Sequence, residues 1–180
     1  MKTIALFGGS FDPPHIGHIA IVKEALKLKD VQKVVIMPTF LNPFKSSFYA
    51  SATLRIKWLK EIFEPFEDVI IDSYEVDLKK PTASVDSVKY LLKKYKKIYL
   101  IIGADNLKKL SKWDRYNELQ KLVTFIVASR DEIEIPISFL KLKVEEDISS
   151  TNLRECICGS KLSPICSNEI IQFYKEKNAK

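Results

Sequence analysis

The sequence contains few cysteines and no long hydrophobic run. Only three of its 180 residues are cysteines, and an odd number argues against the disulfide framework of a small secreted protein. The longest apolar runs have the length of a strand, too short for a membrane-spanning helix. The apolar stretch at the N-terminus ends at Gly8-Gly9, too early for a secretory leader. We therefore expect a cytoplasmic protein without a membrane partner.

The cysteines raise one alternative, a zinc site. Cys156, Cys158 and Cys166 lie close together near the C-terminus. A four-coordinate zinc site needs a further Cys or His, and neither histidine lies nearby in sequence. Buried or surface thiols are the favoured interpretation, and no metal ligand is predicted.

The charge favours acidic partners. The formal net charge is +6 and the sequence pI is about 9.1, which suits phosphates, nucleotides or nucleic acid. The densest basic run, residues 93–97, falls at the end of an expected helix, where lysines complement the helix dipole. That explanation is favoured over an RNA-binding patch, so no nucleic-acid partner is predicted.

Short strand-like runs alternate with segments of helical period. Strands are expected at 3–7, 34–37, 69–72, 98–102, 123–128 and 139–144. Helices are expected at about 17–29, after Ser51, after a cap at Ser84, between 103 and 122, from 150, and again after Pro164 to about 175. The expected buried positions of the second and third helices are Leu54, Trp58, Leu59 and Ile62, and Val85, Val88, Leu92 and Tyr95.

This alternation predicts right-handed βαβ units. The chain is long enough for one domain and too short for two ordinary ones. We expect a Rossmann-like α/β fold, a single domain over residues 1–180, whose mostly parallel sheet is flanked by helices on both faces. Such sheets bind ligands at the carboxyl ends of their strands, so the loops after the strands are the places to search.

The loop after the first strand concentrates the scarce residues. The chain has five glycines and two histidines, and this loop holds Gly8, Gly9, Gly17 and both histidines, His15 and His18. Two glycines after a strand allow a tight turn and a close approach to a ligand. The following helix start offers free N–H groups to an anion. Histidines three residues apart share one side of the helix's first turn, which favours a phosphate-binding site.

Other interpretations of this loop are less favoured. Gly-Gly is often only a turn, and Ser10 or Asp12 could simply cap the helix. Two histidines without nearby cysteines or a carboxylate cluster provide too few ligands to favour a zinc site. The coincidence of both histidines with most of the glycines favours a nucleotide site.

A second motif lies near the other end of the chain, at residues 148–154. Hydroxyls at a helix start are hydrogen-bond donors, and the guanidinium of Arg154 matches phosphate oxygens better than an ammonium would. With the first loop, this motif resembles the HxGH nucleotidyltransferase superfamily. The resemblance implies that His15, His18 and Arg154 are catalytic. It also implies an ATP site formed by Gly8, Gly9, Ser10, Phe11, Gly17, Lys45, Ser149, Ser150 and Thr151.

Within that superfamily, nearly the whole chain resembles the bacterial nicotinate-nucleotide adenylyltransferases. The matching segments are 81–87, 103–107 and Trp113. They imply an acceptor site formed by Ser84, Asp86, Gly103, Asp105 and Trp113, with the tryptophan stacked on the nicotinate ring. The chain departs from the family at Phe44, where a histidine is usual beside the lysine that is Lys45 here.

The resemblance implies adenylyl transfer from ATP to nicotinate mononucleotide, a step of NAD biosynthesis. Mg²⁺ is expected to arrive with ATP and to be bound mainly by phosphates. A phosphopantetheine adenylyltransferase is the alternative that keeps the chemistry and changes the acceptor. A non-catalytic nucleotide- or RNA-binding module is a more distant alternative. A homo-oligomer is compatible with the sequence.

Overall fold

The computed structural model describes residues 2–41, 47–129, 134–145, 149–155 and 157–179. Within these ranges, six strands form one sheet in the order β3-β2-β1-β4-β5-β6. The strands are β1 Thr3–Gly9, β2 Lys33–Pro38, β3 Val69–Ile71, β4 Lys97–Gly103, β5 Thr124–Ser129 and β6 Leu140–Lys143. All neighbouring pairs are parallel, so a sheet expected to be mostly parallel is parallel throughout. This is the strand order of a doubly wound α/β sheet.

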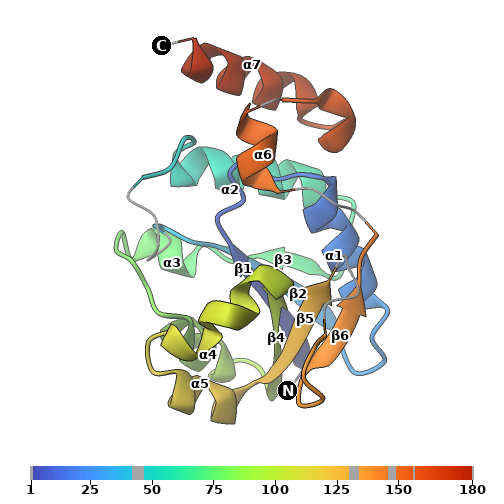
Figure 1. The fold of residues 1–180 in the computed structure, drawn as a ribbon, viewed down its shortest axis with the longest axis vertical. Coiled ribbons are helices and arrows are strands. Elements are labelled where there is room, and N and C mark those ends of the chain that lie inside the picture. Colours follow the sequence, from blue (N-terminus) through green and yellow to red (C-terminus); the bar gives the residue numbers. More distant parts are fainter. Residues whose placement is uncertain (1, 42–46, 130–133, 146–148, 156, 180) are drawn as a thin grey trace.

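Helices cover both faces of this sheet, as expected. They are α1 Ile16–Leu26, α2 Ala52–Phe63, α3 Tyr74–Asp77, α4 Ser84–Leu92, α5 Tyr116–Leu122, α6 Ser150–Glu155 and α7 Ser167–Asn178, with 3₁₀ helices at Ala104–Lys112 and Gly159–Lys161. Figure 1 shows α1, α2, α6 and α7 on one side of the sheet, and α4 and α5 on the other. Among the described helices, none combines the length and the apolar character that crossing a membrane requires.

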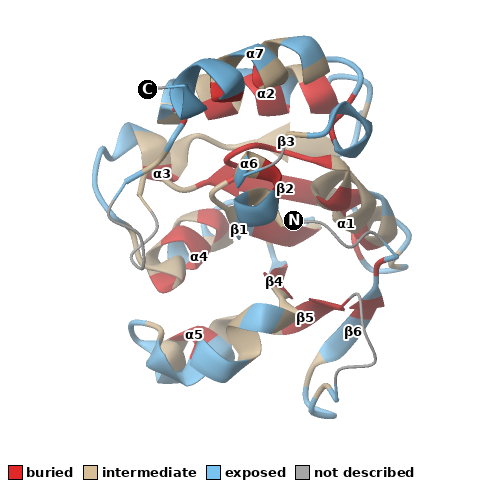
Figure 2. Ribbon diagram, turned by 45° about the horizontal axis from the view of Figure 1, so that its top comes forward, coloured by how far each residue is buried: buried red, intermediate tan, exposed pale blue. Residues whose placement is uncertain are grey.

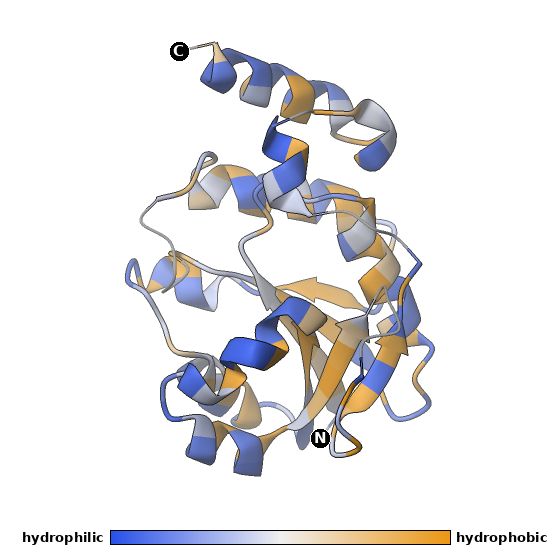
Figure 3. Cartoon of the chain, in the orientation of Figure 1, coloured by the Kyte–Doolittle hydropathy of each residue, from blue (hydrophilic) through white to orange (hydrophobic). Residues whose placement is uncertain are grey.

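The core has two halves because side chains alternate along a strand. From β1, Ala5 and Phe7 pack on the side of α1 and α2, whereas Ile4 and Leu6 pack on the side of α4 and α5. The four central strands, β2, β1, β4 and β5, are buried between exposed outer helix faces (Figure 2), and they are strongly hydrophobic (Figure 3). Near-continuous hydrophobic strands are typical of a sheet covered on both faces.

The structure corrects the third expected helix, α4. Ala83 is the N-cap residue and Ser84 is already the first residue of the helix, so the expected cap at Ser84 is wrong by one position. Val85 and Val88 are buried as expected, and Leu92 is partly buried against the same core; Leu91 is a fully buried position that was not expected. The helix ends at Leu92, so Tyr95 lies beyond it, but its side chain packs partly buried against the core as expected.

The short helix α3 lies between the third strand and α4, where the sequence analysis expected no helix. It carries Glu75, whose side chain is buried at 6% exposure. The hydroxyl of Ser87 in α4 donates a 2.6 Å hydrogen bond to Glu75 Oε1. Burial raises the pKa of Glu75 to about 7, although the bond from Ser87 opposes this rise. The contact therefore joins α3 to α4 through a carboxyl group that titrates near neutral pH.

We predict that Glu75 makes the protein less stable as pH rises. A carboxyl group with a raised pKa holds its proton more tightly in the folded chain than in the unfolded chain. The free energy of unfolding should therefore fall between about pH 5 and about pH 8, by up to about 3 kcal/mol from this residue. Glu75→Gln mimics the protonated side chain, so its stability should exceed that of the unmodified chain only at the higher pH.

Chemical denaturation across this pH range tests the prediction. Glu64→Gln is the matched control, because Glu64 is exposed at the end of α2. Parallel stability curves for Glu75→Gln and the unmodified chain would contradict the assignment.

Candidate active site

Both histidines lie at the start of α1, which begins directly after the loop that follows β1. His15 is the N-cap residue, and its backbone N–H donates a 3.1 Å hydrogen bond to Nδ1 of His18. The two rings stack with centroids 3.7 Å apart. The expectation that both imidazoles share one side of the first turn is confirmed. Because Nδ1 of His18 accepts a hydrogen bond, a neutral ring carries its proton on Nε2, where it can be donated to a ligand.

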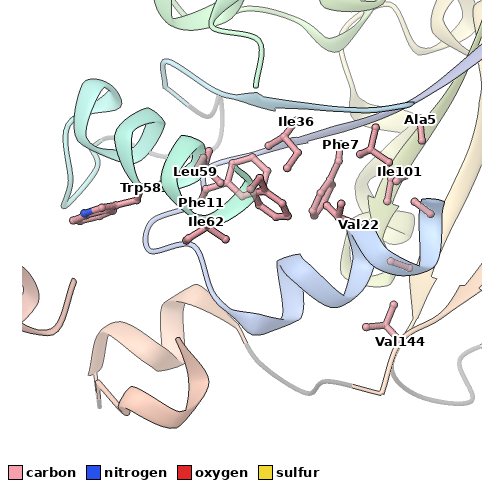
Figure 4. Packing of buried hydrophobic residues seen from close by; sticks show 14 of the residues in the cluster. Ala5, Phe7, Phe11, Val22, Ile36, Trp58, Leu59, Ile62, Ile101 and Val144 are labelled. Carbon is pink, nitrogen blue, oxygen red and sulfur yellow. The ribbon is translucent and has the colours of Figure 1, made fainter. Parts of the chain in front are cut away.

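The ring of Phe11 packs against the ring of His18. Its backbone is left-handed (φ 50°), and its ring is 1% exposed, with its centroid 4.8 Å from that of His18. Figure 4 shows the ring among residues of β1 and α2. A Cβ atom added at Gly9 would lie 3.1 Å from the Phe11 ring, so the glycine allows this close approach. Phe11 was expected to bind ATP, but its side chain lies in the core, so only its backbone could contact a nucleotide.

Asp12, which the sequence offered only as a possible cap, has a different role. It is 1% exposed, and its carboxylate accepts 3.0 Å hydrogen bonds from the backbone N–H groups of Tyr49 and Ala50. The hydroxyl of Tyr174 in α7 donates a third hydrogen bond to the same carboxylate. Burying a carboxylate is costly unless donors replace water. Asp12 thus fastens the histidine loop to the segment before α2 and to the last helix.

Arg55 is a second residue that the sequence analysis missed. It is fully buried in α2, and its guanidinium donates to the carbonyl oxygens of Ser10 at 2.6 Å, Thr39 at 2.9 Å and Ala50 at 3.2 Å. Burial lowers the pKa of Arg55, while the nearby negative charge of Asp12 raises it; an arginine stays charged throughout. One side chain therefore joins the loops that follow β1 and β2.

Helix α6 brings the second motif to the same loop. Arg154 Nη1 donates a 2.6 Å hydrogen bond to the carbonyl oxygen of Asp12, three residues before His15. Arg154 Nη2 donates to Thr151 Oγ1 at 3.2 Å. Ser150 Oγ donates to the carbonyl oxygen of Pro13 at 3.0 Å. Two motifs more than 130 residues apart in sequence thus meet in one place.

An open pocket lies beside Arg154. It has a volume of about 420 Å³ and is lined by Tyr49, Thr151, Arg154, Glu155 and Asn178. The guanidinium of Arg154 lies 5.0 Å from the Tyr49 ring centroid. Ser149, also expected in the ATP site, instead accepts a hydrogen bond from the backbone of Asn152 at 3.2 Å and so stabilises the first turn of α6. The pocket thus offers a charged group and an aromatic surface.

A second open pocket, of about 380 Å³, lies at the amino ends of the strands. Its lining residues are Thr3, Lys29, Asp30, Gln32, Lys96 and Lys97, at the amino ends of β1 and β4. Ligands of doubly wound sheets bind at the carboxyl ends of the strands. The pocket beside Arg154 is the better candidate, because Arg154 bonds to the loop after β1, although neither histidine is among the residues that line it.

The first two acceptor candidates lie at the start of α4. Ser84 is half-buried there. Asp86 forms an ion pair with Arg115, 2.5 Å from Asp86 Oδ2 to Arg115 Nη2, and Arg115 also contacts Asp114. Arg115 has a left-handed backbone (φ 51°). Any contact of Asp86 with a ligand would compete with this exposed ion pair.

The other acceptor candidates follow β4. The side chain of Asp105 lies close to Gly103: a Cβ atom added at Gly103 would lie 2.4 Å from Asp105 Oδ1. A side chain at position 103 would therefore displace the carboxylate. Trp113 is half-buried at the end of the 3₁₀ helix, and its buried indole N–H has no hydrogen-bond partner within the described residues. β4 pairs directly with β1, so this loop adjoins the histidine loop.

Other candidates divide between described and undescribed parts of the chain. Gly8 is exposed at the end of β1, and Gly17 is buried in the first turn of α1. Lys45 and Phe44 lie outside the described residues. Of the cysteines, Cys158 is exposed and Cys166 is buried, while Cys156 lies outside the described residues. Burial raises the pKa of Cys166 to about 12, which keeps it a thiol.

Comparisons with known proteins show which sequences this chain resembles. Residues 6–156 match the cytidylyltransferase-like family. A probable nicotinate-nucleotide adenylyltransferase of Sulfurimonas denitrificans is 58% identical over 180 residues, covering 100% of this chain and 99% of the relative. A similarly named protein of Nitratiruptor is 52% identical, covering 96% of this chain and 98% of its own length.

A solved structure supports the fold alone. The nicotinic acid mononucleotide adenylyltransferase of Plasmodium falciparum, solved in complex with NaAD, superposes with a TM-score of 0.76. It shares 17% sequence identity, and the match covers 97% of this chain and 98% of that one. The resemblance expected from the two motifs is thus confirmed along the whole chain by the closer relatives.

We predict that Arg55→Lys lowers the free energy of unfolding by about 2–4 kcal/mol, because a single ammonium cannot reach carbonyls on three segments and leaves some of them buried without a donor. Arg55→Met should cost at least as much. Lys60→Met, on the exposed side of α2, is the matched control and should change stability little. Urea denaturation measures all three, and a Lys variant as stable as the control would show that the carbonyls do not need the guanidinium.

Proposed function

The chain belongs to the cytidylyltransferase-like family and, within it, to the nicotinate-nucleotide adenylyltransferases, and from this premise we propose that His15, His18 and Arg154 carry its reaction. The activity is transfer of an adenylyl group from ATP to nicotinate mononucleotide in NAD biosynthesis. The observation that supports the proposed residues is their convergence, with Arg154 bonded to the backbone three residues before the stacked histidines.

The reaction needs no protein nucleophile. An oxygen of the acceptor's 5′-phosphate forms a bond to the α-phosphorus of ATP in line with the bond that breaks, and pyrophosphate leaves with that electron pair. The protein's task is therefore to position the two substrates and to stabilise charge on the phosphate chain. We propose that His18 donates from Nε2 to the α-phosphate region, and that His15 stacks beside it to fix the ring's orientation.

Arg154 has donors to spare for the leaving pyrophosphate. A guanidinium carries five N–H donors, and the described contacts use one for the carbonyl oxygen of Asp12 and one for the hydroxyl of Thr151. The remaining donors suit the paired oxygens of a phosphate. Ser150 and Thr151 lie in the first turn of α6, where their roles are to hold that turn against Pro13 and to orient Arg154.

The acceptor site is proposed across the adjoining loop after β4. Trp113 is half-buried, which leaves part of the side chain exposed for stacking on a pyridine, whereas its indole N–H is buried. Ser84, Asp86, Gly103 and Asp105 complete the proposed acceptor site.

We propose that Mg²⁺ accompanies ATP. The side chains around the histidine loop, namely imidazoles, hydroxyls and a guanidinium, suit phosphate oxygens better than a hard cation. These residues therefore fit an ion that is held mainly by the substrate's phosphates and neutralises their charge. The chain's own groups bind and orient the phosphates.

Pyrophosphate release tests the acceptor. The purified chain is incubated with Mg-ATP and, separately, nicotinate mononucleotide, nicotinamide mononucleotide and phosphopantetheine. We expect rapid release with the nicotinate acceptor and release slower by at least about ten-fold with the amide, because a site built for a carboxylate leaves donors unpaired against an amide. Equal rates with both pyridine nucleotides would contradict the acceptor site. Release with phosphopantetheine alone would contradict the acceptor itself.

His18 gives the sharpest test of the catalytic assignment. His18→Ala should lower kcat by about 10² or more, as loss of a single transition-state donor typically does. His18→Asn is the matched variant: its amide oxygen can still accept the hydrogen bond from the backbone of His15, but it has no donor at the position of Nε2.

We expect both variants to lose kcat to a similar extent, with only His18→Ala destabilising the first turn of α1. Lys23→Ala, on the exposed part of the same helix, serves as the control. Near-normal turnover of His18→Asn would remove Nε2 from the mechanism.

A further inference from the structure

Helix α7 contacts Arg154 of α6 by two routes. Asn178, at the end of α7, donates from Nδ2 to the backbone carbonyl oxygen of Arg154 at 2.9 Å. Tyr174, one turn earlier, donates to the carboxylate of Asp12, and the carbonyl oxygen of Asp12 receives Arg154 Nη1. The last helix therefore contacts the arginine directly at its backbone and indirectly at its guanidinium.

Tyr174 is built to hold its position. Its side chain is fully buried. Its ring centroid lies 5.1 Å from that of Phe173 and 6.2 Å from that of Trp58 in α2. Burial, reinforced by the negative charge of Asp12, raises the pKa of Tyr174, so its hydroxyl remains a donor. The buried hydroxyl thus holds the carboxylate of Asp12, and with it the Asp12 backbone, in one position.

Asp12 connects the hydroxyl of Tyr174 to the guanidinium of Arg154. Its carboxylate is bonded by Tyr174, Tyr49 and Ala50, all neutral donors, while its carbonyl oxygen faces Arg154. A residue held by three bonds on its side chain has little freedom to rotate its own peptide group. The position of the Asp12 carbonyl oxygen, which accepts the 2.6 Å bond from Arg154, therefore depends in part on Tyr174 of α7.

We propose that Tyr174 is a positioning residue for ATP: through Asp12 it sets the guanidinium of Arg154 toward the phosphate chain, with Asn178 holding the same residue's backbone. This inference rests on the proposed role of Arg154. It assigns a function in the reaction to the C-terminal helix, which otherwise serves only as a cover over α2.

Tyr174→Phe is the primary test, because it removes the hydroxyl and keeps the packed ring. We expect the KM for Mg-ATP to rise about ten-fold and kcat to fall several-fold, since small misplacements of a positioning group are costly even far from the chemistry. The KM for nicotinate mononucleotide should stay within about two-fold of the unmodified value, because its proposed site lies beyond β4. Asn178→Ala, at an exposed position, should raise the KM for ATP less and leave the melting temperature unchanged.

Loss of stability is the rival explanation, and α7 offers matched controls. Ile170 is fully buried one turn before Tyr174 and makes no described contact with Asp12. Ile170→Val and Ile170→Ala should lower the melting temperature by amounts that bracket the Tyr174→Phe effect while leaving the KM for ATP unchanged. If they raise this KM as Tyr174→Phe does, the hydroxyl has only a structural role and the proposal is overturned.

A double-mutant cycle with Arg154 identifies the route. In an Arg154→Lys background, Tyr174→Phe should change the KM for ATP by less than about two-fold, because the group that it positions is gone. A full additional effect would mean that Tyr174 acts independently of Arg154, which also overturns the proposal. The unmodified chain separates the two failures: no pyrophosphate release from it contradicts the proposed function, whereas normal release with an unaffected Tyr174→Phe variant contradicts this inference alone.

Discussion

The rest of the site depends on a buried carboxylate whose described hydrogen bonds all come from neutral donors. Asp12 is 1% exposed, and its charge is stabilised by two backbone N–H groups and the hydroxyl of Tyr174. These donors come from the segment before α2 and from α7, and the latter contact joins residues 162 positions apart. A buried charge needs all its donors together. The histidine loop is therefore held in its shape both by the segment before α2 and by the last helix.

The sheet explains why this loop is where substrates can meet. The parallel strands β1 and β4 are neighbours, and their connections leave toward opposite faces of the sheet, α1 to one and the 3₁₀ helix and α5 to the other. A crevice opens at such a switch point. The two proposed half-sites follow from this split, with the phosphate groups of ATP on the side of α1 and the pyridine ring on the side of Trp113.

Local patterns predicted the fold and the two motifs, but not the contacts between them. The alternating strands, the paired histidines and Arg154 are visible within a few residues of sequence. Arg55 could have been found, because it shares a helical face with the expected buried positions Trp58, Leu59 and Ile62, and a charge on such a face requires partners. Tyr174 has the spacing of a core residue, yet nothing in sequence indicates that it meets Asp12. The burial of Glu75 depends on how α3 packs against α4, which short-range periodicity does not encode.

The way Asp12 is bonded also determines the charge that a ligand meets. Within the described residues, neither Arg55 nor Arg154 forms an ion pair; both guanidinium groups bond to carbonyl oxygens, and Asp12 is stabilised by neutral donors. Had Arg154 bonded the carboxylate of Asp12, the pair would have cancelled most of its attraction for a polyanion. Bonding to the carbonyl oxygen fixes the guanidinium and keeps its charge. A positive charge that is oriented in advance and not engaged in a direct ion pair suits a triphosphate, because little reorganisation remains when the phosphates arrive.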